Sequence, residues 1–245
     1  MSEEINDENA PVRDLPSEES GGLSHEDFAG DKFYKFAKGR GVMNLPNKLT
    51  VSRMVMIPVF VLFFYLEFTG HFFVALAVFA IASLTDLFDG KIARRYNLVT
   101  NLGKFLDPIA DKVLVSSAFI IMLTSPWIFT LFTGSWALIV AGCGVALILA
   151  REIIISGFRM VAADSGKVIA ADMFGKYKTV FQDASIVVLL ISAGVTELVD
   201  LASDAAYTAA QVVNYVGLVL FAAAIVLTVL SGINYIVKNI DVLKK

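Results

Sequence analysis

Four aspartates stand at helical spacing in a short stretch of the chain. Asp86 and Asp89 are three residues apart, and Asp107 and Asp111 are four residues apart. Residues at these spacings share one face of an α-helix, so two successive helices would each present a pair of carboxylates. If these helices are antiparallel neighbours, the short connection between them brings all four carboxylates to one level. Such a cluster needs counter-charge, because neighbouring negative charges oppose one another's ionisation.

The ligand types indicate which counter-charge fits the cluster. Its donors are carboxylate oxygens without His or Cys, which suits Mg²⁺ or Mn²⁺ better than Zn²⁺. Hard cations held by carboxylates are typical of phosphoryl chemistry, where they offset phosphate charge and orient the leaving group. Gly90 and Gly103 remove side chains where a ligand must approach a helix backbone closely. The alternative is a solvated cluster at helix ends, with glycines that serve helix packing.

The region also resembles a known family signature. The pattern reads D-x-x-D-G-x-x-A-R, then eight residues, then G-x-x-x-D-x-x-x-D. It is similar at every position to the signature of the CDP-alcohol phosphotransferase family. The positions that carry the resemblance are Asp86, Asp89, Gly90, Ala93, Arg94, Gly103, Asp107 and Asp111. The resemblance implies six transmembrane helices, a homodimer and a metal site that faces the cytoplasm.

The resemblance implies roles for these residues as well. The first three aspartates would hold one or two divalent ions, Mg²⁺ or Mn²⁺, and Asp111 would join them and act as general base. Asp107 and Asp111 are therefore the expected catalytic residues. The implied reaction is a direct displacement, in which an acceptor hydroxyl attacks the phosphorus that bears the diacylglycerol and CMP leaves. The residues expected to line the cytidine diphosphate pocket are Asp86, Gly90, Ala93, Arg94 and Gly103.

The acceptor alcohol must be inferred from other residues. Arg151 and Arg159 are eight residues apart and share a helix face, and Lys176 and Thr179 are three apart. Arg and Lys are the usual partners of phosphate, so these residues predict a pocket for an anionic acceptor. The alternative is that the cations are ordinary basic residues at the cytoplasmic membrane face.

Two stretches are similar to the family members whose acceptor is sn-glycerol 3-phosphate, namely 44–53 and 151–182. This resemblance implies CDP-diacylglycerol and glycerol 3-phosphate as substrates. Asn47 would then reach the nucleotide, with a role near the helix cap as the alternative. Arg53 would face the metal cavity and help to bind the acceptor phosphate. Rival acceptors are phosphatidylglycerol, as in a cardiolipin synthase, and a phosphorylated inositol. A remote rival is a divalent-metal transporter, because intramembrane carboxylates also mark ion paths.

The elements that must position these residues are apolar. Hydrophobic residues make up 57% of the chain and mean hydropathy is +0.71, whereas a soluble domain is about 45–50% apolar. About 20 apolar residues are needed for a helix to cross a bilayer. The sequence therefore predicts an all-α, polytopic membrane protein with six spans: 48–68, 71–95, 102–125, 134–161, 174–195 and 210–237.

The basic residues predict the orientation. All 20 Lys and Arg lie on or near the side that holds both termini, and the loop 196–209 on the other side is acidic. Basic residues concentrate on the cytoplasmic side. We therefore expect a multi-pass protein of the cytoplasmic membrane, with both termini and the active site in the cytoplasm and with no nucleic-acid partner.

The chain before the first span differs from the rest. Residues 1–30 are acidic and poor in large apolar side chains, which is typical of a disordered leader. Residues 31–43 alternate aromatic with basic residues, which favours an amphipathic helix on an anionic membrane face over a plain basic linker. The membrane domain is expected to occupy 44–245.

Overall fold

The computed structural model describes residues 45–95, 101–164, 173–198 and 204–239. Within these helices, some residues are described by their backbone alone, at 45–46, 87–95, 101–108, 111, 161, 163–164, 173–174 and 204. The expected leader at 1–30 and the amphipathic segment at 31–43 lie outside the described residues.

The described part of the chain is entirely helical. Six long α-helices and one short one follow each other: α2 (Leu45–Tyr65), α3 (His71–Arg95), α4 (Asn101–Leu123), α5 (Trp127–Thr130), α6 (Trp136–Asp164), α7 (Met173–Leu198) and α8 (Asp204–Asn239). Each of the six predicted spans corresponds to one long helix. The all-α prediction is confirmed, and α5 is an addition that the hydropathy pattern did not indicate.

Two turns of the described chain set helix boundaries that differ from the prediction by two or three residues. The first span was expected to reach residue 68, but α2 ends at Tyr65 and the chain turns through Gly70, whose φ is 85°. Gly134 has a φ of 94° in the turn before α6. Glycine adopts positive φ without the steric cost that a Cβ imposes. The predicted spans left a break at 69–70, which contains Gly70, whereas Gly134 is the predicted first residue of the fourth span and lies two residues before α6 begins.

Four helices of the described chain are long and apolar enough to cross a membrane: Asn47–Tyr65, Trp136–Met160, Gly175–Leu198 and Ala205–Asn239. The apolar parts of α3 and α4 are shorter, at His71–Asp86 and Lys112–Leu123. Both helices continue beyond these parts, and the sequence of the continuations carries the charged signature residues. The molecule is therefore a helical membrane protein in which two helices devote one end to polar groups.

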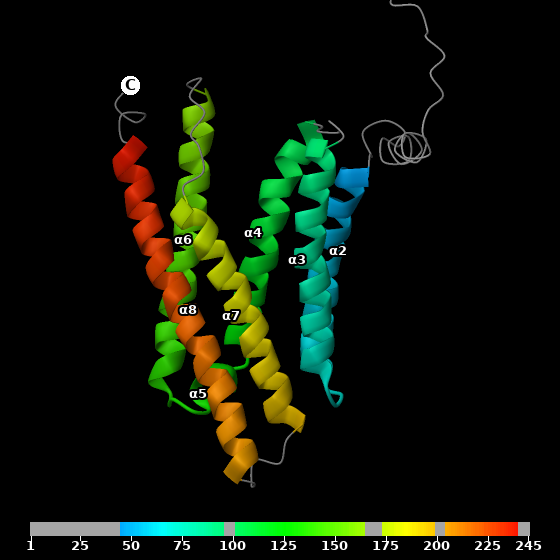
Figure 1. Ribbon diagram of the computed structural model, residues 1–245, viewed down its shortest axis with the longest axis vertical. Helices are drawn as coiled ribbons and strands as arrows, with labels where there is room; N and C mark the ends of the chain where they lie inside the picture. The colour runs from blue at the N-terminus through cyan, green and yellow to red at the C-terminus, as the bar shows by residue number, and fades with distance from the viewer. Residues whose placement is uncertain (1–44, 96–100, 165–172, 199–203, 240–245) are drawn as a thin grey trace, which may run out of the picture. The chain divides into compact units, whose positions relative to one another are not determined.

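Helix packing brings the signature helices against α2. The most extensive helix contacts are between α7 and α8 and between α2 and α3, and α2 also contacts α4 (Figure 1). Phenylalanines fill much of the core, with Phe60, Phe64, Phe79 and Phe119 almost completely buried. The end of α3 and the start of α4 lie at the same end of these helices in Figure 1.

Candidate active site

Asp86 is the signature aspartate whose side chain the structure describes. Its Oδ1 forms an ion pair with Nη1 of Arg53, which reaches across from α2 to α3. The Arg53 side chain is fully buried, whereas that of Asp86 is 37% exposed. The carboxylate is therefore held by a buried cation and still remains accessible to a ligand.

Arg53 belongs to a polar face of α2. Asn47, Thr50 and Arg53 follow each other at intervals of three residues, and all three side chains are buried. Buried polar groups cost free energy unless they are paired. Since α2 packs against both α3 and α4, these residues give the signature end of the three helices a polar interior.

A second polar group joins α6 and α7. Lys178 is buried, and its Nζ forms an ion pair with Oε1 of Glu152. Nη1 of Arg151 lies 3.5 Å from the same Glu152 oxygen. One carboxylate is thus shared by two cations, which fixes the position of both.

The two predicted arginines of α6 are held by α8. Nη2 of Arg151 donates a hydrogen bond of 3.0 Å to Oγ of Ser231. Nε of Arg159 donates one of 3.3 Å to the hydroxyl of Tyr235, and its guanidinium carbon lies 5.5 Å from the centre of that ring. Both arginines are therefore positioned by contacts with another helix, which ordinary lipid-facing cations do not require.

α4 connects the two polar groups. Nζ of Lys112 contacts Oγ of Ser156 on α6, and Ser156 donates a hydrogen bond of 2.6 Å to the carbonyl of Glu152. Lys112 directly follows the signature residue Asp111. The turn of α4 that carries Asp111 therefore lies within a lysine side chain's reach of the Arg151–Glu152 segment of α6.

The remaining predicted residues divide into two sets. Lys176 is exposed, and Thr179 donates a hydrogen bond of 3.1 Å to the carbonyl of Gly175 in its own helix. The other set is described by backbone alone, and its side chains lie outside the described residues: Asp89, Gly90, Ala93, Arg94, Gly103, Asp107 and Asp111. Among the described side chains, no three of His, Cys, Asp or Glu are gathered as a metal site.

Sequence reasoning missed the role of Lys178 and of α8. Lys178, Gln182 and Ser185 form a buried polar stripe at positions i, i+4 and i+7 of α7. That spacing was a usable signal, and it favours Lys178 over Lys176 as the inward lysine. Ser231 and Tyr235 gave no such signal, because their partners are about 80 residues away in the chain.

The fold and this site define an all-α membrane protein with a polar centre built on α2, α3, α4, α6 and α7. The chain belongs to the CDP-alcohol phosphatidyltransferase family, whose model matches residues 43–230.

Two bacterial relatives match most of the chain. A Bacillus subtilis (strain 168) protein is 38% identical over 216 residues, which span 83% of this chain and 98% of that protein. An Escherichia coli (strain K12) protein is 38% identical over 195 residues, or 79% of this chain and 93% of that protein. Both carry the name CDP-diacylglycerol–glycerol-3-phosphate 3-phosphatidyltransferase.

Proposed function

We propose that the protein transfers the phosphatidyl group of CDP-diacylglycerol to sn-glycerol 3-phosphate, which yields phosphatidylglycerol phosphate and CMP. The observation that carries the proposal is the similarity to relatives named for this reaction, at 38% identity over almost their entire length. The matched part of the family model includes the signature at 86–111 and the cationic segment at 151–182.

The proposed reaction is a direct displacement at phosphorus. The acceptor hydroxyl gives its proton to the Asp111 carboxylate, and its oxygen bonds to the phosphorus that carries the diacylglycerol. The bond from that phosphorus to the CMP oxygen breaks, and CMP leaves with the electron pair. A base in this role must lie within hydrogen-bond reach of the hydroxyl. Arg94, together with Gly90, Ala93, Gly103, Asp86 and Asn47, would bind the cytidine diphosphate.

A divalent metal fits the donors that the signature supplies. Asp86, Asp89, Asp107 and Asp111 would hold Mg²⁺ or Mn²⁺, as one or two ions, because their donors are all carboxylate oxygens. The partly exposed Asp86 carboxylate, which Arg53 holds in place, agrees with such a ligand. When bound, the metal would offset charge on the pyrophosphate as the bond to CMP breaks.

The acceptor phosphate would bind to the cations of α6 and α7. Arg151 and Arg159 are anchored by α8, which prepares their guanidinium groups for a phosphate with little further loss of side-chain freedom. Lys176, Thr179 and Arg53 would complete this pocket. Lys178 would contribute through Glu152, since the ion pair between them keeps Glu152 close to Arg151.

The membrane arrangement follows from the same charges. We propose that all six long helices cross the cytoplasmic membrane, with both termini and the active site on the cytoplasmic side. α3 and α4 would cross with their polar ends inside a wet cavity, where water and ions lower the cost of buried charge. A homodimer and an interfacial helix at 31–43 complete the proposal.

The deciding experiment uses the purified full chain in detergent with CDP-diacylglycerol, Mg²⁺ or Mn²⁺, and one acceptor at a time. We expect CMP release with glycerol 3-phosphate and none with phosphatidylglycerol or inositol phosphate. Release with phosphatidylglycerol, but not with glycerol 3-phosphate, would overturn the proposed acceptor and leave the displacement chemistry intact.

A further inference from the structure

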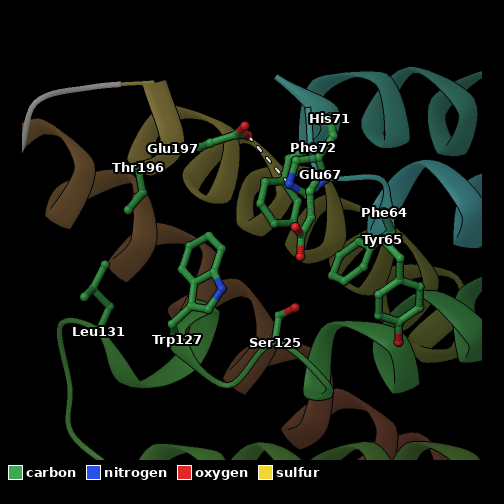
Figure 2. Close-up of a pocket in the computed structure, with 10 residues that line it drawn as sticks. All are labelled: Phe64, Tyr65, Glu67, His71, Phe72, Ser125, Trp127, Leu131, Thr196 and Glu197. Carbon is green, nitrogen blue, oxygen red and sulfur yellow. Dashed lines mark ion pairs between the residues drawn. The ribbon is translucent and has the colours of Figure 1, made fainter. Parts of the chain in front are cut away.

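A cavity of about 520 Å³ lies far from the signature, where α2 ends and α3 begins. His71, the first residue of α3, is one of its walls, and Asp86 follows 15 residues later in that helix. At 1.5 Å per residue, the two are separated by about 22 Å along the helix axis. α5 and the end of α7 supply the other walls (Figure 2). This cavity is therefore separate from the proposed active site.

Two glutamates give the cavity a negative charge. Figure 2 shows the Glu197 carboxylate directed toward His71 and the Glu67 side chain pointing into the cavity. Every lining residue belongs to one of three segments, 54–90, 113–150 and 179–237, and none of these segments contains Lys or Arg. The walls themselves thus supply no strong cation to balance the glutamates.

Glu197 has local partners, but Glu67 does not. The backbone N–H of Gly70 donates a hydrogen bond of 2.9 Å to Glu197 Oε1, and His71 Nε2 lies 3.9 Å from Oε2. Within the described part of the chain, Glu67 forms no hydrogen bond or ion pair. Its charge is therefore available to a ligand.

Two polar atoms of the wall are buried without a partner. Nδ1 of His71 and Oγ1 of Thr196 form no hydrogen bond with any of the described residues. Buried polar atoms are nearly always hydrogen-bonded in folded proteins, and leaving one unpaired costs free energy. These two atoms therefore indicate that a ligand with hydrogen-bond donors completes the site.

The rest of the wall is aromatic. The rings of Phe72 and Trp127 pack edge to face, with their centres 5.4 Å apart, and Phe64 and Tyr65 also line the cavity. The face of an aromatic ring attracts a cation, and Trp does so most strongly. Aromatic faces next to carboxylates favour a cation that carries apolar carbon, such as an organic ammonium, over a bare metal ion.

We propose that this cavity binds an organic ammonium group, with Glu67 and Glu197 as counter-charge and Trp127 as the aromatic contact. His71 Nδ1 and Thr196 Oγ1 accept hydrogen bonds from the ammonium N–H groups. The cavity volume lies within the range of about 300–1,000 Å³ that is usual for small-molecule sites. The ammonium belongs either to a lipid headgroup at this membrane face or to a soluble amine.

The chain offers a built-in reporter for the test. It contains two tryptophans, Trp127 and the exposed Trp136, so Trp136→Phe leaves Trp127 as the single fluorophore. The purified Trp136→Phe protein is titrated in detergent with ethanolamine, with choline and with neohexyl alcohol, the uncharged isostere of choline. We expect saturable changes in fluorescence with both cations, and tighter binding of ethanolamine, because choline has no N–H group to donate to His71 or Thr196. Binding of the alcohol is expected to be at least about tenfold weaker than that of choline. Equal binding of the alcohol and choline would overturn the proposal.

Glu67→Gln provides the matched variant. Glu67 has no partner in the described structure, so loss of its charge should leave folding and CMP release unchanged. We expect ethanolamine and choline to bind about tenfold more weakly. Glu67→Asp keeps the charge and is expected to bind more tightly than Glu67→Gln. Unaltered amine binding by Glu67→Gln, or a response to Mg²⁺ or Zn²⁺ without one to ethanolamine, would overturn the proposal.

A second experiment, in lipid, distinguishes a lipid headgroup from a soluble amine as the source of the ammonium. The same protein is placed in nanodiscs of phosphatidylglycerol, with or without phosphatidylethanolamine. If a lipid headgroup is the ligand, phosphatidylethanolamine produces the change in Trp127 fluorescence, and Glu67→Gln weakens that change. If a soluble amine is the ligand, only free ethanolamine or choline produces it. Because CMP release is scored separately, failure of this proposal is distinguishable from failure of the proposed transferase activity.

Discussion

Asp111 is the residue on which the proposed chemistry depends most. Asp111→Asn removes the base while keeping the size of the side chain, so we expect turnover to fall by at least about 100-fold. Binding of CDP-diacylglycerol should largely survive, because the other signature residues remain. CMP release and calorimetric titration with the nucleotide lipid measure the two effects. Normal turnover in this variant would exclude Asp111 as the base.

The Arg53–Asp86 ion pair predicts an unequal response to loss of either partner. Asp86→Asn deprives a fully buried guanidinium of a carboxylate, whereas Arg53→Met leaves a carboxylate that water reaches. Burying a charge without its partner is the more costly outcome. Without added metal, we therefore expect Asp86→Asn to lower the thermal unfolding temperature in detergent more than Arg53→Met does. The opposite order would show that Arg53 contributes through packing rather than through this pair.

At the scale of single residues, spacing predicted some positions and not others. The aspartates of α3 and α4 were found from local helical periodicity, and Asp86 lies on a helix as expected. Arg53 was expected to face the metal cavity and to bind the acceptor phosphate, and its ion pair with Asp86 was not predicted. Helical periodicity relates residues within about two turns, and an ion pair between two helices depends on how those helices pack.

Helix α8 illustrates how one element positions the residues of another. Ser231 accepts a hydrogen bond from Arg151, so Ser231→Ala should leave this guanidinium less ordered. We expect the KM for glycerol 3-phosphate to rise about three- to tenfold, or about 0.7–1.4 kcal/mol. This is less than the about 1.5–3 kcal/mol of a hydrogen bond to a charged group, because Ser231 orients Arg151 and does not itself bind the phosphate. The KM for CDP-diacylglycerol should not change.

Thr228→Ala is the matched control for that prediction. Thr228 is buried one turn earlier on α8, and its hydroxyl donates a hydrogen bond of 2.6 Å to the carbonyl of Ala224 in the same helix. It therefore tests loss of a buried hydroxyl without loss of the contact with Arg151. An equal rise in KM for both variants would show that Ser231 acts through packing of α8 alone.

The contact between α7 and α8 depends on a small residue. A Cβ at Gly217 would lie 2.8 Å from Cγ and Cδ2 of Leu189, and 3.3 Å from its backbone nitrogen. Gly217→Ala should therefore destabilise the protein by about 1–3 kcal/mol, the usual cost of overpacking, despite the better helix propensity of alanine. Gly142→Ala in α6 is the control, since a Cβ there meets nothing within 4 Å. Thermal unfolding in detergent should separate the two variants.

The elements themselves were predictable from hydropathy, because a long apolar run has few structures open to it in a membrane. The helix boundaries were less predictable. α8 begins six residues before its predicted start at 210 and ends at Asn239. The alanines and tyrosine at its start are compatible with a helix but only weakly apolar. α5 was missed for the related reason that four residues are too few for a periodic signal.

At the scale of the whole molecule, charge distinguishes the two ends of the helices. The signature and the cations of α6 and α7 belong to one end, and the acidic, aromatic cavity at His71 belongs to the other. Basic residues are retained on the cytoplasmic side during insertion. The proposed active site and the proposed ammonium site should therefore face opposite sides of the membrane.

Cysteine labelling tests this orientation. The single native cysteine, Cys143, is exposed on α6 and is first replaced by alanine. Thr69 lies in the turn beside the ammonium cavity, and Val99 comes in the sequence after the last residue of α3 and before the first residue of α4; each is replaced by cysteine in turn. On intact cells, a membrane-impermeant maleimide should label Thr69→Cys, and Val99→Cys should react only after permeabilisation. The reverse pattern would place the signature aspartates outside the cytoplasm, where they would have no access to cytoplasmic glycerol 3-phosphate. Such a result would contradict the proposed topology, whereas the proposed transferase activity rests on similarity to its relatives and is tested separately by CMP release in detergent.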